Sequence, residues 1–209
     1  MKVLMINGSC NEKGCTNKAL ETVAEVLRQE GVESEIVQLG KLPYRDCVGC
    51  GTCRKTCSGK CVFNDDIVNT IIDKARTADG FVFGSPVYYA HPSGRLLSVL
   101  DRAFYASGEA FAFKPGAAVV SARRAGTTAS IDVINKYFTI NKMPVVSSTY
   151  WNMVHGTKTE DVSQDQEGLQ TMRNIGRNMA WLLKIIENGK TCGLETPQPE
   201  NGARTNFIR

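Results

Sequence analysis

Short apolar runs and longer amphipathic stretches alternate along this chain. The apolar runs predict five strands, at residues 2–7, 32–39, 80–84, 116–122 and 144–149. The amphipathic stretches predict five helices, at residues 16–30, 67–78, 93–102, 130–140 and 164–188. The run at 80–84 is almost wholly apolar, as expected for a strand buried on both faces of a parallel sheet. The alternation of strand and helix therefore predicts a doubly wound α/β fold with a five-stranded parallel sheet.

The segment after the second predicted strand departs from this pattern. Five of the eight cysteines fall within residues 47–61, which predicts an irregular cysteine-rich insertion at that point. A chain of 209 residues with 42% hydrophobic side chains has the usual size of one α/β domain with its own core. We therefore expect a single domain over residues 1–209, with an extended C-terminal tail over residues 189–209.

Charge and the N-terminal segment exclude several classes of protein. The formal net charge is +4, and the sequence has no basic run or aromatic-basic alternation that could follow a nucleic-acid backbone. The apolar stretch at residues 3–6 is too short for a signal-peptide core or a membrane span, so we expect a cytoplasmic protein with reduced thiols and no membrane partner. With only His91 and His155, a histidine-based zinc centre or a Ser-His-Asp hydrolase has few candidates.

Residues 8–17, between the first strand and the first helix, combine hydroxyl groups with the backbone N–H groups of a helix N-terminus. The helix dipole favours an anion there, and a phosphate group would fit, although an ordinary capped turn has a similar composition. The loop contains neither Gly-x-x-x-x-Gly-Lys-Ser/Thr nor Gly-x-Gly-x-x-Gly. A monophosphate is therefore favoured over a nucleoside triphosphate or a dinucleotide.

Two further loops leave predicted strands at the same edge of the sheet, where open parallel sheets bind ligands. Residues 85–89 form a proline-stiffened turn whose two tyrosines can cover the face of a planar heterocycle, although they also fit core and rim positions. Residues 121–128 bring two guanidinium groups, three hydroxyls and a glycine to this edge, and alone they would be an ordinary surface turn. Three such loops on one rim favour a ligand site.

These loops belong to a set of motifs that a known family shares. The motifs are Gly8-Ser9, Gly14-Cys15-Thr16, Gly84-Ser85-Pro86-Val87-Tyr88, Ser93-Gly94 and Leu100-Asp101-Arg102. With them the chain resembles, over essentially its whole length, the flavodoxin-like NAD(P)H-dependent FMN reductases. The cysteine segment further resembles that of the iron-sulfur flavoproteins in the same superfamily. The resemblance implies a flavodoxin-like fold of three layers and FMN as cofactor.

The resemblance also assigns residues to FMN. The phosphate is expected on Ser9, Cys15, Thr16 and Asn17. The edge of the isoalloxazine ring is expected on Pro86, Val87, Tyr88 and Tyr89. Further contacts are expected from Ser121, Arg124, Ala125, Gly126 and Thr127. Cys10 stands where the family often has proline, which predicts a less rigid loop without removing the phosphate site.

Flavin chemistry needs little acid–base work from the protein, because the ring itself accepts hydride and returns electrons. No residue is therefore certain to be catalytic. We expect Arg124 to place positive charge near the reduced ring, and for His155 we favour a structural hydrogen bond over a role as proton donor. The resemblance implies NAD(P)H as the electron-donating substrate and a small-molecule acceptor such as a quinone or a flavin.

The spacing Cys47-x-x-Cys50-x-x-Cys53, followed by Cys57 and Cys61, is close to that of ferredoxins and lets thiolates converge on one cluster. The resemblance implies a [4Fe–4S] cluster on four of these cysteines. We expect Cys47, Cys50, Cys53 and Cys61, because the turn before Cys61 can bring it back toward the others, with Cys57 as the alternative. Two alternative interpretations of the cysteine segment stay open: a zinc ion bound by four thiolates, and a loop of reduced thiols without a metal. With a cluster, a ferredoxin-like protein would supply single electrons that pass through it to FMN.

Other functions fit parts of the sequence. Low-molecular-weight phosphatases also place a cysteine-bearing anion loop after their first strand, but they need an arginine where Thr16 and Asn17 follow Cys15. A non-catalytic flavin electron carrier usually presents a strongly acidic face, whereas this chain is slightly basic. Both observations favour an oxidoreductase. The apolar side chains around Trp181 in the last predicted helix favour a homo-oligomer, either a dimer or a tetramer.

Overall fold

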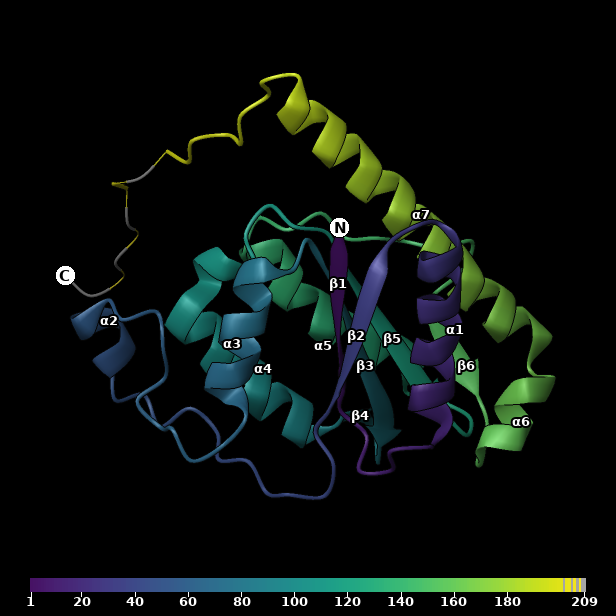
Figure 1. The fold of residues 1–209 in the computed structure, drawn as a ribbon. Coiled ribbons are helices and arrows are strands. Elements are labelled where there is room, and N and C mark those ends of the chain that lie inside the picture. Colours follow the sequence, from purple (N-terminus) through teal and green to yellow (C-terminus); the bar gives the residue numbers. More distant parts are fainter. Residues whose placement is uncertain (201, 204, 206, 208–209) are drawn as a thin grey trace.

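The computed structural model describes residues 1–200, 202, 203, 205 and 207, and within them a central sheet carries helices on both faces (Figure 1). The strands are β1 (Lys2–Asn7), β2 (Glu33–Gln38), β3 (Gly80–Tyr88), β4 (His91–Pro92), β5 (Gly116–Ala122) and β6 (Met153–His155). Five of these strands run parallel in the order β2-β1-β3-β5-β6, and β4 pairs antiparallel with β3. This is the flavodoxin-like strand order, so the predicted fold class is confirmed.

Two buried clusters hold the helices on the sheet and make the three layers. The helices are α1 (Cys15–Gln29), α2 (Thr52–Thr56), α3 (Val68–Thr77), α4 (Gly94–Ser107), α5 (Thr127–Ile140), α6 (Thr159–Gln164) and α7 (Gln166–Thr191), with a 3₁₀ turn at Gly108–Ala110. One cluster packs Val23 of α1 and Ile175 of α7 against one face of the sheet. The other packs Leu100 of α4 and Phe138 of α5 against the opposite face. Both faces are therefore apolar, and polar loops concentrate at the strand ends.

The fifth strand lies elsewhere than predicted. Instead of a continuous strand at residues 144–149, Val145 forms an isolated bridge with Gly116, and the chain leaves the sheet before it returns as β6. The excursion bonds to helix α7: Asn178 Nδ2 donates to Ser147 O over 2.9 Å, and Ser148 Oγ donates to the Thr171 carbonyl over 2.8 Å. Because these polar groups bond to α7 rather than to β5, the fifth strand is interrupted.

Several element boundaries also differ from the prediction. Residues 85–88, predicted as a loop, extend strand β3 and turn back through β4 as a short hairpin. Helix α4 continues to Ser107, and α5 begins at Thr127, three residues before its predicted start. The predicted helix at 164–188 is α7, which begins at Gln166 after the separate helix α6. Asp165 ends α6 and starts α7, because its carboxylate accepts the Gly168 N–H over 2.9 Å.

The cysteine-rich insertion follows β2 as predicted and contains the short helix α2. At the other end of the chain, residues 194–200 are irregular and exposed. Positions 201, 204, 206, 208 and 209 of the predicted tail lie outside the described residues. Within the described part of the chain, no helix is long and apolar enough to cross a membrane.

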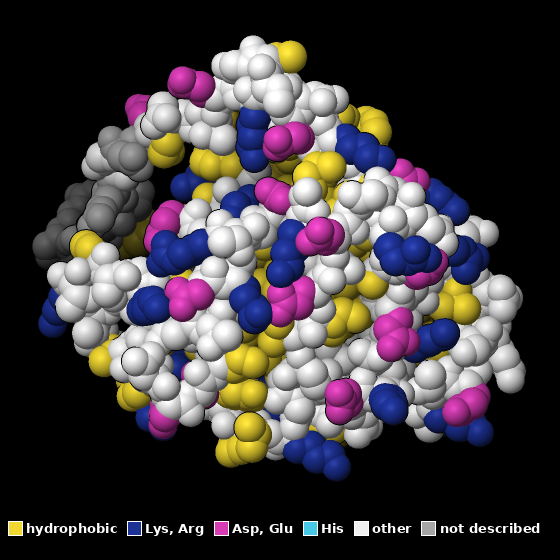
Figure 2. Space-filling model, in the orientation of Figure 1, with side chains coloured by type: hydrophobic (Ala, Val, Ile, Leu, Met, Phe, Trp, Pro, Cys, Tyr) yellow, Lys and Arg dark blue, Asp and Glu magenta, His cyan; other side chains and the backbone are white. Residues whose placement is uncertain are grey.

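Charged residues are unevenly distributed along the chain. On the face shown in Figure 2, basic and acidic side chains are interspersed. The ion pairs of the protein include Lys74 with Glu35 and Lys184 with Glu30. The segment 41–63, which contains the insertion, differs, because its five basic residues against one acidic residue give a formal charge of +4. The whole chain also carries +4, so the remainder is formally neutral. Segment 41–63 thus accounts for all of the net charge.

Candidate functional site

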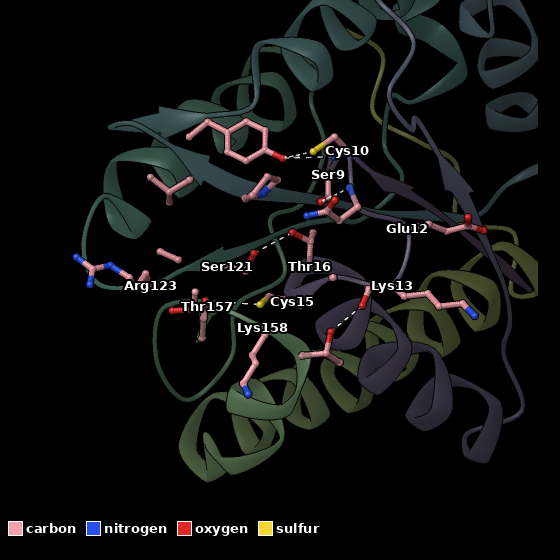
Figure 3. A pocket seen from close by; sticks show the side chains of 18 of the residues that line it. Ser9, Cys10, Glu12, Lys13, Cys15, Thr16, Ser121, Arg123, Thr157 and Lys158 are labelled. Atoms are coloured by element: carbon pink, nitrogen blue, oxygen red, sulfur yellow. Dashed lines mark hydrogen bonds between the residues drawn. The ribbon is translucent and has the colours of Figure 1, made fainter.

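The carboxyl ends of β1, β3, β5 and β6 surround a cavity of about 850 Å³ (Figure 3). The register places Asn7 of β1 beside Gly84 of β3, and Pro86 of β3 beside Ser121 of β5. The loops that follow these strands therefore open onto the same edge of the sheet. A cavity of this size at the carboxyl ends of parallel strands is a typical ligand site.

Helix α1 begins at the wall of this cavity. Gly14 occupies the N-cap position and has no side chain to cap the helix, so the first-turn N–H groups are available to an anion. Gly84 lets α1 approach β3 closely, because a Cβ atom there would stand 2.8 Å from Leu20 Cδ1. Ser9 lies beside this turn, and its Oγ accepts the Asn11 N–H over 3.0 Å. The predicted phosphate loop therefore has the geometry of an anion site.

Two contacts fix the first turn of α1 against neighbouring strand ends. Thr16 Oγ1 lies 2.8 Å from Ser121 Oγ at the end of β5. Cys15 Sγ donates to the Gly156 carbonyl, just after β6, over 3.5 Å. These two residues and Ser9 line the cavity, whereas Asn17 lies outside its wall. Asn17 instead donates to Glu21 over 2.7 Å.

Burial raises the pKa of the Cys15 thiol, and the carboxylates of Asp161 and Glu160 act in the same direction. A raised pKa keeps the thiol neutral at neutral pH. The thiolate is the nucleophilic form of cysteine, so Cys15 is poorly suited to attack a phosphate ester. This electrostatic setting argues against the phosphatase alternative.

The hairpin of β3 and β4 forms a second wall, to which Pro86, Val87 and Tyr88 contribute. Ser85 stabilises the turn, because its hydroxyl accepts the Ser93 N–H and donates to the Pro86 carbonyl, each over 2.8 Å. These bonds hold Pro86 and Val87 at the cavity edge.

The two predicted ring-binding tyrosines have different environments. The Tyr88 hydroxyl lies 2.9 Å from Cys10 Sγ in the β1–α1 loop, and Figure 3 shows this contact beside the labelled Cys10. Burial raises the pKa of Tyr88, and the hydrogen bond with Cys10 adds to the shift. Tyr89, at the hairpin tip, is fully exposed with φ of 60°. The structure thus places Tyr88 in the site and Tyr89 at its outer rim.

The third predicted loop contributes a different arginine from the one expected. Arg123 lines the cavity, whereas Arg124 and Ala125 are exposed outside its wall. Gly126, with φ of 88°, starts helix α5 and packs against the hairpin, where a Cβ would stand 2.8 Å from the nearest atom. Thr127 is buried in the first turn of α5. Among the described residues, Arg123 is thus the arginine that lines the cavity.

Sequence reasoning missed Gln38, the last residue of β2. Its Nε2 donates to the Ser9 carbonyl over 2.8 Å, and the side chain lines the cavity. Among the described residues, Gln38 Oε1 is buried without a hydrogen-bond partner. Such an acceptor costs about 1–3 kcal/mol unless a ligand supplies a donor. The sequence could have indicated Gln38 as a site residue, because it lies near the carboxyl end of a predicted strand.

Residues 156–159, after β6, complete the cavity wall and were also missed. Thr159 Oγ1 donates to the Lys13 carbonyl over 2.6 Å, which joins this segment to the β1–α1 loop. Lys13, Lys41 and Lys158 make the cavity wall basic, together with the arginine of the third loop. This segment follows β6 directly. Because the sequence placed the last strand at residues 144–149 instead, it did not place residues 156–159 at the strand end.

His155 lies next to this wall rather than in it. Its backbone N–H donates to Asp165 Oδ2 over 2.7 Å, and its Nδ1 lies 3.9 Å from the same oxygen. Asp165 is also the residue that caps α7. The His155 ring thus lies beside the Asp165 carboxylate, and the structural role expected for it stays a prediction.

A second cavity, of about 450 Å³, lies between the cysteine-rich insertion and helix α4. Four cysteines line it, namely Cys47, Cys50, Cys53 and Cys61. Cys57 is exposed outside the wall, and its thiol donates to the Arg54 carbonyl over 3.3 Å. The four cysteines chosen from the sequence thus line one cavity and Cys57 lies outside its wall, while the ligand set itself stays a prediction.

Individual thiols of this cavity have distinct partners. A hydrogen bond from the Thr52 side chain lowers the pKa of Cys50, and the Thr52 backbone contributes in the same direction. Cys53 Sγ donates to the Tyr105 carbonyl of α4 over 3.7 Å, whereas Cys61 Sγ accepts from Arg102 Nε over 3.3 Å. Within the described residues, no three His, Cys, Asp or Glu side chains are grouped closely enough to hold a single metal ion.

Comparison with known proteins agrees with this architecture. Residues 1–158 match the model of the NADPH-dependent FMN reductase family. An iron-sulfur flavoprotein of Methanocaldococcus jannaschii is 33% identical over 195 residues, covering 90% of this chain and 100% of that protein. An iron-sulfur flavoprotein of Methanosarcina thermophila is 28% identical, covering 91% of this chain and 99% of that protein.

Solved structures show the same fold at low identity. An NAD(P)H:quinone oxidoreductase from Methanothermobacter marburgensis has a TM-score of 0.64 at 17% identity, covering 86% of this chain and 96% of that one. An archaeal flavodoxin has a TM-score of 0.59 at 16% identity, and the match covers 88% of this chain and 99% of that one.

The strand order and the cavity at the strand ends define a flavodoxin-like protein, and its class is that of FMN-dependent oxidoreductases. The chain belongs to the NADPH-dependent FMN reductase family, and relatives that it matches over their full length are iron-sulfur flavoproteins. The family predicted from the sequence motifs is therefore confirmed.

Proposed function

We propose that the 850 Å³ cavity binds FMN, with the phosphate at the N-terminus of α1 and the ring along the β3–β4 hairpin. The uncapped first turn of α1 carries this proposal, since its N–H groups point to an anion site that Ser9 and Thr16 extend with hydroxyls. Gln38 Oε1 would accept a hydrogen bond from a ligand hydroxyl, which would relieve its unpaired state. The residues of this wall fit the cofactor.

Bound FMN would supply hydride and single-electron chemistry. The residues of the chain would bind and bias it. Tyr88 covers the cavity from the hairpin, while Arg123 offers positive charge to a reduced, anionic ring. Ser121, Gly126 and Thr127 would support the ring from the third loop, and Arg124 and Ala125 would act from its rim. A small-molecule acceptor such as a quinone or a flavin would use the open side of the cavity.

For electron entry we propose a [4Fe–4S] cluster in the second cavity, held by Cys47, Cys50, Cys53 and Cys61. The donor set fits such a group in kind, because four cysteines line one cavity and an arginine N–H donates to one of the sulfurs. The cluster would supply one-electron chemistry. The charge of +4 on segment 41–63 favours an acidic, ferredoxin-like protein as donor, because complementary charge speeds productive encounter.

Direct reduction by NAD(P)H is the second candidate, and the basic wall of the first cavity favours it. Lys13, Lys41 and Lys158 would offer cations to the phosphates of a nicotinamide dinucleotide. The two routes share the FMN site and differ in where electrons enter.

One preparation tests the shared site and both routes. Protein purified without oxygen is denatured and its released flavin identified, and its iron and acid-labile sulfide are measured. The rate of flavin reduction is then compared for NADPH, NADH and a reduced acidic ferredoxin. FMN with about four irons and fast reduction by ferredoxin supports the cluster route, and FMN without iron supports the nicotinamide route. Colourless protein that ignores added FMN would overturn the proposal.

The Lys55→Glu variant refines the comparison of donors. Lys55 is an exposed residue of the insertion, and Lys136 on α5 is an exposed lysine outside it. Reversal at Lys55 should slow reduction by ferredoxin with little effect on NADPH, and the slowing should fade at high salt. Equal slowing by Lys136→Glu would contradict a docking role for the insertion.

Homo-oligomerisation is a further proposal. Trp181 and Ile185 are exposed on the outer side of α7, with Tyr150 and Trp151 exposed on the neighbouring excursion. Large apolar side chains in such positions are typical of subunit interfaces, and an even-numbered assembly, a dimer or a tetramer, would bury them. Light scattering at micromolar concentration tests this, and a monomer would contradict it.

A further inference from the structure

We propose that Arg102 is a positioning residue for the cysteine cavity, where it holds the Cys61 sulfur as a negatively charged ligand and raises the reduction potential of the bound cluster. This inference rests on the proposed cluster. It assigns to one buried side chain of α4 a role in the electron-transfer chemistry of the insertion.

Arg102 is a buried arginine whose donors are all used. It is 1% exposed and belongs to the largest fully buried side chains of the described residues. Its Nη1 donates to Asp66 Oδ2 and to the Arg45 carbonyl, the latter over 3.3 Å. Its Nη2 donates to Asp66 Oδ1 over 3.2 Å and to the Phe63 carbonyl over 3.5 Å. The fifth N–H, on Nε, donates to Cys61 Sγ over 3.3 Å.

The acceptor of the fifth N–H distinguishes this arginine from an ordinary structural one. Four of its N–H groups meet oxygen, which is a strong acceptor, whereas Nε–H meets sulfur. A neutral thiol is a weak acceptor, and a buried donor that is poorly paired costs free energy. A thiolate bound to iron carries negative charge and forms a stronger, charge-assisted bond. The geometry therefore suits a metal-bound Cys61 better than a free thiol.

Other contacts at Cys61 fix its backbone in place. The Cys61 N–H donates to Asn69 Oδ1 over 2.8 Å, and Asn69 Nδ2 donates to the Cys61 carbonyl over 3.0 Å. The backbone is thus held by α3, while Arg102 of α4 holds the sulfur. This division explains how Cys61, eight residues beyond Cys53, can join the other three thiols at one cavity.

Hydrogen bonds to ligand sulfurs and the net charge nearby both set the reduction potential of an iron-sulfur cluster. Reduction adds one electron, and therefore one negative charge, to the cluster. The N–H of Arg102 stabilises that added charge, whereas the carboxylate of Asp66 opposes it. Removal of the arginine N–H and removal of the aspartate charge should therefore move the potential in opposite directions.

The test compares Arg102→Lys and Asp66→Asn with wild type, all prepared without oxygen. Iron content, FMN content and the cluster potential from an EPR-monitored titration are measured for each. Arg102→Lys, which keeps the charge but loses the Nε–H bond, should make reduction of the cluster about tenfold less favourable, or about 59 mV lower for a one-electron couple. Asp66→Asn should shift the potential upward, and it carries the test if the lysine variant does not fold.

Lys136→Gln is the matched control for the loss of one positive charge, because Lys136 is exposed on α5, outside the insertion and the Arg102 network. Its cluster potential should equal that of wild type. Unchanged potentials in iron-loaded Arg102→Lys and Asp66→Asn, or shifts of the same sign in both, would overturn the role of Arg102 and leave the cluster proposal intact. Wild type that contains FMN but no iron would overturn the cluster proposal and this inference together.

Discussion

Cys10 and Tyr88 join two segments that lie 78 residues apart in the sequence: the thiol sulfur is 2.9 Å from the tyrosine hydroxyl. The Cys10 N–H also donates to the same hydroxyl oxygen, over 3.4 Å. These contacts connect the β1–α1 loop to the β3–β4 hairpin, so they set the spacing between the proposed phosphate and ring sites. The sequence predicted a less rigid loop with cysteine at this position, and this contact is one means of restraining it.

Tyr88→Phe should weaken FMN binding, because it removes the hydroxyl that meets Cys10 while keeping the aromatic ring. The loss of one hydrogen bond predicts a Kd about threefold to tenfold higher. Quenching of flavin fluorescence on titration with apoprotein measures the change. Tyr89→Phe is the control, since Tyr89 is fully exposed at the hairpin tip and should bind FMN normally. Equal weakening by both variants would contradict a specific role for the contact.

Thr16→Val should weaken FMN more than riboflavin, because Thr16 is proposed to meet the phosphate that riboflavin lacks. A charge-assisted hydrogen bond of about 1.5–3 kcal/mol predicts a Kd for FMN more than tenfold higher. Titration of both flavins measures the difference. Thr16 also bonds to Ser121, so Ser121→Ala is the matched variant that removes this bond and keeps the threonine hydroxyl. Parallel losses for FMN and riboflavin in Thr16→Val would show that the phosphate lies elsewhere.

Cys61→Ser should lose iron in anaerobically prepared protein, whereas Cys57→Ser should keep the wild-type content. The reason is geometric: Cys61 lines the second cavity, and Cys57 is exposed with its thiol bonded to the Arg54 carbonyl. Iron and acid-labile sulfide analysis provides the measurement, and flavin content in the same samples checks folding. The reverse result, with iron in Cys61→Ser and none in Cys57→Ser, would exchange the two ligands.

Glu35→Gln should destabilise the protein at neutral pH by about 0.5–1 kcal/mol, a typical value for partly exposed ion pairs. Hydrogen bonds from Lys2 and Lys74 hold the pKa of Glu35 below its usual value of 4.5. The stabilisation is therefore fully present above pH 4.5 and is lost as the pH falls through the lower folded-state pKa. Urea unfolding of both proteins across this range measures it. Glu33→Gln, at an exposed site on the same strand, should show a smaller effect, and a pH-independent cost at Glu35 would contradict this account.

The hydrophobic pattern predicted most of the fold because each buried strand and each amphipathic helix is specified by local residues. The run at 80–84 and the apolar face through Val23 are examples, and both lie in the core as expected. The fifth strand could not be placed in this way. Its position depends on hydrogen bonds between residues 147 and 148 and helix α7, which are made between segments distant in sequence.

The candidate site likewise contains residues that a local motif predicts and residues that only the tertiary structure brings to the cavity. Motif residues such as Thr16 and Pro86 could be assigned from the sequence and lie on the cavity wall. Gln38 and residues 156–159 were missed, because they join the wall through strand order and register rather than through a local motif. Arg123 and Arg124 are adjacent and both exposed, and the turn that places the first but not the second on the cavity wall is not encoded in their residue type.

The interrupted fifth strand gives this fold a site at which the chain can be lengthened. Residues 147–151 form a surface excursion between two paired ends: Val146 N–H donates to Gly116 O before it, and Val120 N–H donates to Asn152 O after it. Because both ends are anchored to β5, extra residues inserted between them would extend outward without shifting the register of β6. Exposed connections of this kind tolerate insertion well. An affinity tag or a reporter peptide placed here would leave the sheet intact, and it would also obstruct the proposed subunit interface that includes Tyr150 and Trp151.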